Sequence, residues 1–202
     1  LGNQAVVLQS GASFENAGVL EVTGGGAVHA NFGAATFVNT GTVRKSAGEI
    51  TRFERAGGSL SVTNTGTFAI EAGTVRVEAS SFDQRGQVTV GANALLQLST
   101  SGSGGGDYTI ESGGVVRLES GTQVLDTTGG TPQITGPGTF EIAGGVLTVS
   151  TPVLAQTLVL KSGTLNGSSV LTVSGSLTQS GGAQAGTGST VVQSGASFTL
   201  DG

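Results

Sequence analysis

Residues 37–43 read FVNTGTV, and residues 62–68 read VTNTGTF. Both stretches have an apolar residue four positions before a glycine and another apolar residue two positions after it. Short alternating apolar and polar runs interrupted by Asn-Thr-Gly are typical of β-strands joined by tight turns. The second copy follows the first by 25 residues. The pattern therefore indicates a repeat in which each unit is a small group of strands.

The same template fits the whole chain when eight glycines serve as anchors. These anchors are Gly18, Gly41, Gly66, Gly86, Gly114, Gly138, Gly163 and Gly195. The residues four positions before them are all apolar: Phe14, Phe37, Val62, Phe82, Ile110, Ile134, Val159 and Val191. Most residues two and four positions after the anchors are apolar as well. This alternation predicts short strands with one face buried.

The composition excludes several other classes of chain. Glycine makes up 37 of 202 residues, more than twice the roughly 7 % of average proteins. Disordered chains combine low hydrophobicity with high net charge, but here 36 % of residues are hydrophobic and the net charge is -5. Only 3 prolines are present, and no Gly-X-Y period runs through the chain, which excludes collagen. The chain is therefore expected to fold.

One unit of short strands cannot bury its own apolar side, whereas stacked units share a continuous narrow core. We predict an all-β fold, a right-handed parallel β-helix (β-solenoid) of about eight coils of ~25 residues, as a single segment over residues 1–202. An antiparallel sandwich is the rival fold, but it gives no reason for one template to repeat. The absence of Met and of a polar cap at either end predicts that the segment is part of a longer or assembled chain.

Stacking of the template makes two further predictions about neighbouring coils. Three positions after the anchors, Glu21 would lie beside Arg44, and Arg117 beside Glu141. Two positions before the anchors stand the amides Asn16, Asn39, Asn64 and Gln84. These amides either form a hydrogen-bonded ladder along the stack or serve only as turn residues.

The repeats resemble those of a known group of proteins. The segments at 37–43 and 62–68, together with LTVSGSLTQSGG at 171–182, are similar to the β-strand repeats of large bacterial surface and secreted proteins. Autotransporter passengers and filamentous-haemagglutinin-like adhesins are the groups we name. The resemblance implies a right-handed β-helix, export, and a structural or adhesive role. It carries no catalytic residues across to this chain.

The sequence predicts no catalytic, cofactor-binding or metal-binding residues. Cysteine is absent, and His29 is the only histidine. Residues 102–107, GSGGGD, approach a calcium repeat, but they occur once, whereas calcium rolls need consecutive copies. Asp83 and Asp107 are candidates for the carboxylate pair of a polysaccharide-degrading β-helix, and Tyr108 is the only tyrosine available to a sugar. A threonine array for ice binding is interrupted at Val19, among other positions.

We therefore expect a non-enzymatic extracellular or cell-surface module: a rigid stalk, an adhesin repeat or a subunit of a surface fibre. Its expected partners are further β-helix coils of the same or neighbouring subunits, stacked end to end, and surface glycans. With only 8 Lys and Arg residues, nucleic acid is not an expected partner. The sequence contains no stretch of 18 apolar residues, so no membrane-spanning helix is expected. The alternative is a carbohydrate-binding or polysaccharide-degrading β-helix module.

Overall fold

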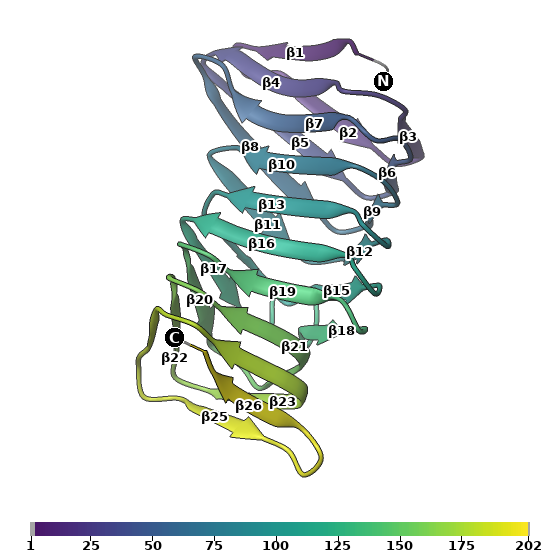
Figure 1. Ribbon diagram of the computed structural model, residues 1–202. Coiled ribbons are helices and arrows are strands. Elements are labelled where there is room, and N and C mark those ends of the chain that lie inside the picture. The colour runs from purple at the N-terminus through teal and green to yellow at the C-terminus, as the bar shows by residue number, and fades with distance from the viewer. Residues whose placement is uncertain (1–2, 202) are drawn as a thin grey trace.

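The computed structural model describes residues 3–201, and this part of the chain is a rod of stacked parallel strands without any helix (Figure 1). Each coil crosses three faces, and almost every strand pairs with the strand of the next coil on the same face. On one face the pairing is interrupted once, so this face consists of a four-stranded and a five-stranded sheet. We call these faces 1, 2 and 3 in the order in which the chain visits them. The all-β solenoid predicted from the repeat is confirmed.

Face 1 runs down the front of the rod in Figure 1, with the N-terminal coil at the top. Its strands are β1 (Ala5–Gln9), β4 (Ala27–Phe32), β7 (Ile50–Arg55), β10 (Thr74–Glu78), β13 (Leu95–Ser99), β16 (Val115–Ser120), β19 (Thr139–Ile142) and β26 (Ser197–Leu200). The strands of face 2 are β2 (Ser13–Asn16), β5 (Ala34–Asn39), β8 (Ser59–Asn64), β11 (Ser81–Gln84), β14 (Gly102–Gly104), β17 (Thr122–Leu125), β20 (Val146–Val149), β22 (Thr164–Gly167) and β24 (Ala183–Gln184).

Face 3 is continuous with face 1 near the C-terminal end. Its strands are β3 (Val19–Val22), β6 (Thr42–Lys45), β9 (Thr67–Ile70), β12 (Gln87–Val90), β15 (Asp107–Ile110), β18 (Gln133–Thr135) and β25 (Ser189–Val192). Two longer strands, β21 (Val153–Leu160) and β23 (Val170–Gln179), begin on face 3 and end on face 1. Faces 1 and 3 therefore form one 17-stranded sheet.

The rod has about nine turns, one more than predicted. Coil 1 is β1–β3, coil 2 is β4–β6, and each later coil again takes one strand from each face. Residues in register on successive coils are 18 to 26 positions apart, as for Leu147 and Leu165 or Tyr108 and Ile134. At about 4.8 Å per coil, the stack is about 45 Å long. Right-handed winding stays a prediction from the general preference of parallel crossovers.

The anchor glycines explain the difference in the number of turns. Gly18, Gly41, Gly66 and Gly86 all precede strands of face 3, so they stack on one corner. Gly114, Gly138 and Gly195 instead precede strands of face 1, and Gly163 precedes a strand of face 2. Three of the four intervals between anchors after Gly86 thus join different corners and overstate the length of a coil.

Alternate residues of each strand point inward and form one core along the axis. Of the eight hydrophobic residues predicted to face inward, five are buried: Phe37, Val62, Phe82, Ile110 and Ile134. Phe14 packs against this core and is partly buried. Val159 and Val191 were wrongly predicted, since they face outward on their strands, and Val191 is 45 % exposed. The template lost its register in this region because its anchors had changed corner.

Aromatic rings fill the core of the first four coils. Phe14 stacks on Phe37 with ring centroids 5.5 Å apart, and Phe53 lies edge-on to Phe37 at 5.1 Å. Phe68 continues the cluster to Phe82 with centroids 5.9 Å apart. Such pairs add about 0.5–1.5 kcal/mol to the effect of buried area alone. The cluster ties the three faces together across a narrow interior.

The corner between faces 2 and 3 has no room for a side chain within the stack. A Cβ atom on Gly41 would lie 2.2 Å from the carbonyl oxygen of Gly18. A Cβ atom on Gly66 or Gly86 would lie 2.1 Å from the carbonyl oxygen of the glycine one coil earlier. Gly18, at the outer end, has nothing within 4 Å of its Cβ position. Glycine at this corner is therefore required by the contact between coils.

Among residues 3–201, no helix is long and apolar enough to cross a membrane.

Candidate functional site

A ladder of buried amides runs beside the glycine corner in coils 1 to 4. The Nδ2 of Asn16 donates to Oδ1 of Asn39 at 2.7 Å, and the Nδ2 of Asn39 donates to Oδ1 of Asn64 at 2.7 Å. The Nδ2 of Asn64 then donates to Oε1 of Gln84 at 2.6 Å. All four side chains are buried. The four amides therefore form a hydrogen-bonded ladder and do not serve only as turn residues.

Each Asn amide in this ladder also binds the backbone of the following coil. Asn16 donates to the carbonyl oxygen of Thr42 at 2.9 Å, and Asn39 donates to that of Thr67 at 3.0 Å. Buried polar groups stabilise a fold only when their hydrogen-bonding capacity is filled. Here one carboxamide per coil fixes both the side-chain stack and the height of the next turn. The ladder is thus a mechanical tie between coils.

Lys45 faces the core from β6, at a position where the other coils carry apolar residues. Its side chain is fully buried. The Nζ donates to the carbonyl oxygen of Gly24 at 2.9 Å and also to that of Ala47. Burial lowers the pKa of Lys45, and the charge of Glu49 acts weakly in the opposite direction. A neutral amine still has the two hydrogens that these two carbonyl groups require.

We expect Lys45 to make the free energy of unfolding depend on alkaline pH. Its pKa is lower in the folded chain than the ordinary 10.5, so between these two values the unfolded chain binds more protons. Stability should therefore rise with pH through this range, and this rise should be absent from Lys45→Met. The measurement is urea unfolding of both proteins at a series of pH values.

The buried phenol of Tyr108 provides the background for this comparison. Burial raises the pKa of Tyr108, which lowers stability above about pH 10 by the same linkage. Because both proteins contain Tyr108, the difference between the two pH profiles isolates Lys45. Profiles that stay parallel would show that the amine is not desolvated.

The residues weighed for carbohydrate chemistry lie apart in the structure. Asp83 is on β11 of face 2, where its Oδ1 accepts from the backbone N–H of Ser103 at 3.2 Å. Asp107 is on β15 of face 3, where its Oδ1 accepts from the N–H of Gln133 at 3.0 Å. Tyr108 points into the core and is 2 % exposed. The structure thus does not bring the two carboxylates together, and it presents no tyrosine ring to a sugar.

His29 lies on a strand of the stack, and residues 102–107 include another short strand. His29 is half-buried on the outer side of β4, between Val7 and Glu54 of the neighbouring coils. Gly102–Gly104 forms the short strand β14, and a Cβ atom on Gly102 would lie 1.9 Å from the carbonyl oxygen of Phe82. Over the described residues 3–201, no three His, Cys, Asp or Glu side chains are grouped to hold a metal ion.

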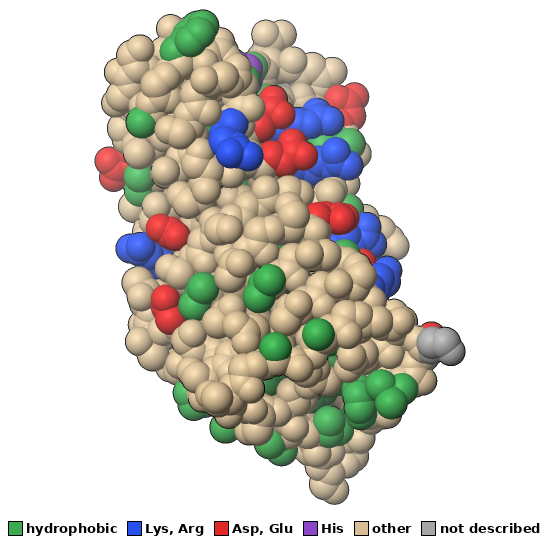
Figure 2. Space-filling model, turned by 90° about the vertical axis from the view of Figure 1, so that its left-hand side faces the viewer, with side chains coloured by type: hydrophobic (Ala, Val, Ile, Leu, Met, Phe, Trp, Pro, Cys, Tyr) green, Lys and Arg blue, Asp and Glu red, His purple; other side chains and the backbone are tan. Residues whose placement is uncertain are grey.

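Charged side chains gather on the N-terminal half of the rod (Figure 2). Both predicted ion pairs are present, with Arg44 3.7 Å from Glu21 and Arg117 2.9 Å from Glu141. Arg44 has a second partner, Glu71, at 2.7 Å, and this bond raises the pKa of Arg44 and lowers that of Glu71. The exposed pairs of Arg44 contribute only about 0–1 kcal/mol each. Glu141, in contrast, is buried and has a second partner in Lys161 at 3.0 Å, although its template position was expected to face solvent.

The N-terminal end of the rod exposes apolar side chains and an unpaired edge. Val19 is 68 % exposed, and the inward-facing Phe14 and Leu20 are only partly buried because no coil within residues 3–201 covers them. Such an edge can bind further strands.

The C-terminal end differs, because the last coil turns polar side chains inward. Gln184 stands in register with Leu165, and Thr190 with Leu171. Oγ1 of Thr190 donates to Oε1 of Gln184 at 2.9 Å, and Nε2 of Gln184 donates to Oε1 of Gln179 at 3.0 Å. These inward-facing polar groups were not predicted from the sequence. Beyond this network, Leu200 of β26 is still 73 % exposed.

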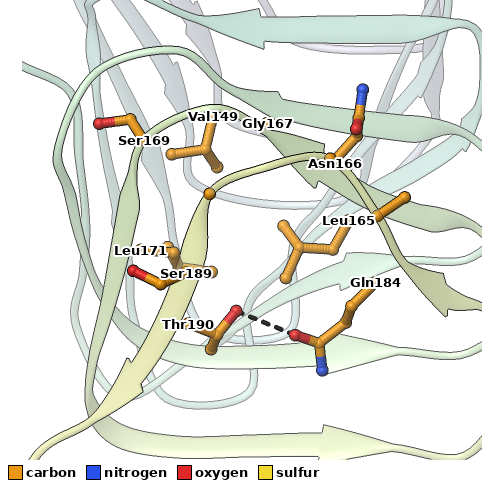
Figure 3. A pocket seen from close by; sticks show the side chains of 12 residues that line it. Val149, Leu165, Asn166, Gly167, Ser169, Leu171, Gln184, Ser189 and Thr190 are labelled. Atoms are coloured by element: carbon orange, nitrogen blue, oxygen red, sulfur yellow. Dashed lines mark hydrogen bonds between the residues drawn. The ribbon is translucent and has the colours of Figure 1, made fainter.

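A cavity of about 140 Å³ lies where the apolar core meets this polar network. In Figure 3 the side chains of Leu165 and Leu171 reach into it from opposite sides, and the Gln184–Thr190 hydrogen bond closes one edge. Gly186 and Gly188 form the wall contributed by the last coil. No charged side chain lines this cavity, so it offers neither an acid nor a base for catalysis.

Comparison of the chain with protein-family models, with characterised proteins and with solved structures gave no match. The resemblance to autotransporter and filamentous-haemagglutinin-like repeats therefore stays a prediction.

Proposed function

We propose that this chain is a non-enzymatic structural or adhesive module of an extracellular or bacterial cell-surface protein. In this role it acts as a rigid stalk, an adhesin repeat or a subunit of a surface fibre. Further coils of the same or a neighbouring subunit cover its ends, and surface glycans are candidate ligands. The observation that carries the proposal is the stacking of every coil in three parallel faces, with the amide ladder as an internal tie.

The mechanical argument follows from the direction of the bonds. Hydrogen bonds between coils lie along the rod axis, for example from the N–H of Thr67 to the carbonyl oxygen of Gly41 at 2.8 Å. Tension along the axis therefore loads all the bonds between two coils together. In repeat proteins each unit contacts only its neighbours, so the rod should yield one coil at a time. A stalk with this behaviour absorbs load stepwise and does not fail in one event.

Single-molecule pulling from the two ends of the chain tests this proposal. We expect a series of steps that each release one coil, or roughly 60–90 Å of chain at ~3.3–3.6 Å per residue. Steps in coils 1 to 4, which contain the amide ladder, should need the highest force. Extension of the whole chain in one event, or without resistance above that of an unfolded polypeptide, would contradict a load-bearing role.

A further inference from the structure

Face 1 carries a repeated charge pattern on its outer side. The sequences Arg-x-Glu occur on β7 as Arg52 and Glu54, and on β10 as Arg76 and Glu78. Because alternate residues of a strand point to the same side, both members of each pair lie on the outer side while the residue between them is buried. A third copy, on β16, lies two coils further along.

The register places like charges directly above one another. Arg52 is in register with Arg76, and Glu54 with Glu78. Neighbouring strands are about 4.8 Å apart, so the rod displays a basic column beside an acidic column. Like charges at this separation repel each other. An opposite charge from outside the chain would relieve the repulsion in both columns at once.

Partners within the chain satisfy these charges poorly. Nε of Arg52 lies 4.0 Å from Oε2 of Glu54, the outer limit of an ion pair. The side chains of Arg76 and Glu78 form no hydrogen bond or ion pair within residues 3–201, and Nε of Arg76 is buried without an acceptor. By contrast, Arg44 on face 3 binds Glu71 at 2.7 Å. No opposite charge within residues 3–201 therefore neutralises Arg76 or Glu78, the two central charges of face 1.

We propose that a second copy of this chain docks on face 1, side by side, with the two rod axes parallel and corresponding ends together. A two-fold axis along the rods, midway between the columns, places the basic column of each copy opposite the acidic column of the other. Arg76 of one copy then faces Glu78 of the other, and the same contact occurs twice. An antiparallel two-fold dimer would place arginine opposite arginine, so the charges select the parallel arrangement.

The size of face 1 is sufficient for such a contact. Strands of five or six residues give a width of about 17–20 Å, and the stack is about 45 Å long. The face thus offers roughly 800 Å² per copy, the standard size for a specific interface. Exposed ion pairs contribute little each and are screened by salt, so we expect a dimer that forms at low ionic strength and dissociates at high ionic strength. This contact uses the side of the rod and does not depend on what covers the ends.

Charge reversal of the two central residues gives the test. Sedimentation velocity of the wild type should show a dimer at about 0.02 M ionic strength and a monomer at about 0.5 M. Arg76→Glu alone and Glu78→Arg alone should each weaken dimerisation at least about tenfold, because each places like charges opposite one another. An equimolar mixture of the two variants should restore the dimer, since one copy then presents only acidic groups at this coil and the other only basic groups. The neutral variant R76Q/E78Q should also weaken the dimer, without any added repulsion to disturb folding.

The matched control is the swap R44E/E71R, which reverses an ion pair on face 3 and should leave dimerisation unchanged. A wild type that stays monomeric at low ionic strength would overturn the proposal. So would a dimer that persists in both single variants, or a mixture of variants that stays monomeric. None of these results bears on the stepwise unfolding expected under load, so this inference and the proposed function can fail separately.

Discussion

Replacing Gly66 by alanine is expected to lower the free energy of unfolding by about 3 kcal/mol or more. The new Cβ would lie 2.1 Å from the carbonyl oxygen of Gly41, and that backbone cannot move without separating two coils. Its backbone angles do not require glycine, so the effect would arise from the contact alone. Urea unfolding monitored by circular dichroism provides the measurement.

Gly18→Ala is the matched control for this prediction. Gly18 occupies the same corner one coil before Gly41, but nothing lies within 4 Å of its Cβ position. We expect a change within about 0.5 kcal/mol, as for ordinary surface substitutions. If the two alanine variants were equally stable, close approach of the coils at this corner would be disproved.

Replacing Asn39 by alanine should destabilise the rod by about 3–5 kcal/mol. Asn39 accepts one ladder hydrogen bond, donates another to Asn64, and holds the carbonyl oxygen of Thr67. The substitution leaves buried groups of both neighbouring amides unsatisfied. Asn16→Ala, at the open end, should cost only about 1 kcal/mol, because it breaks the ladder on one side only.

Asn39→Asp tests the direction of the ladder as well as its presence. A carboxylate can accept from Asn16, but it has no hydrogen to donate to Asn64. The variant should be as unstable as Asn39→Ala near neutral pH. Because only the protonated carboxyl can donate, its pKa would be raised in the folded chain, and stability relative to the wild type should recover as the pH falls. If the two proteins responded identically to pH, the assigned ladder would be wrong.

The amino-acid sequence was sufficient to predict how successive coils contact one another. Stacking of the template placed Asn16, Asn39 and Asn64 on successive coils, but the sequence left open whether they form a ladder or serve only as turn residues. The structure shows the ladder. The Arg117–Glu141 ion pair was predicted in the same way. These features depend on the register between adjacent coils, which the alternating pattern specifies locally.

Features that depend on counting along the whole rod were predicted less well. Turns at all three corners use glycine, so Gly86 and Gly114 look alike in the sequence although they occupy different corners. A single template therefore drifts from one corner to another and undercounts the coils. Lys45 did fall at an inward-facing position of the template, but its two carbonyl partners come from loops whose path the pattern does not contain.

The features of the candidate site were likewise predicted only in part from the sequence. The expectation that further coils cover the N-terminal edge stays a prediction. The inward-facing Gln184 and Thr190 were missed, because the last coils have slipped relative to the template and their direction was unknown. The charge columns of face 1 were also missed, since β7 and β10 lie between anchors. The Arg-x-Glu sequences at 52–54 and 76–78, which are 24 residues apart, were the signal that could have revealed them.

The amide ladder also gives the rod a chemical polarity. Every side-chain bond in it points the same way, with the nitrogen on the earlier coil and the oxygen on the later one. In coil 1, no residue within 3–201 donates a hydrogen bond to the side-chain oxygen of Asn16. If two rods met by their N-terminal ends, the two Asn16 side-chain oxygens would face each other and could not form a hydrogen bond. A coil that offered an N–H group at this position would continue the amide ladder. The ladder therefore distinguishes the two directions along the rod axis, because any coil added in register at this end would have to donate to Asn16 and not accept from it.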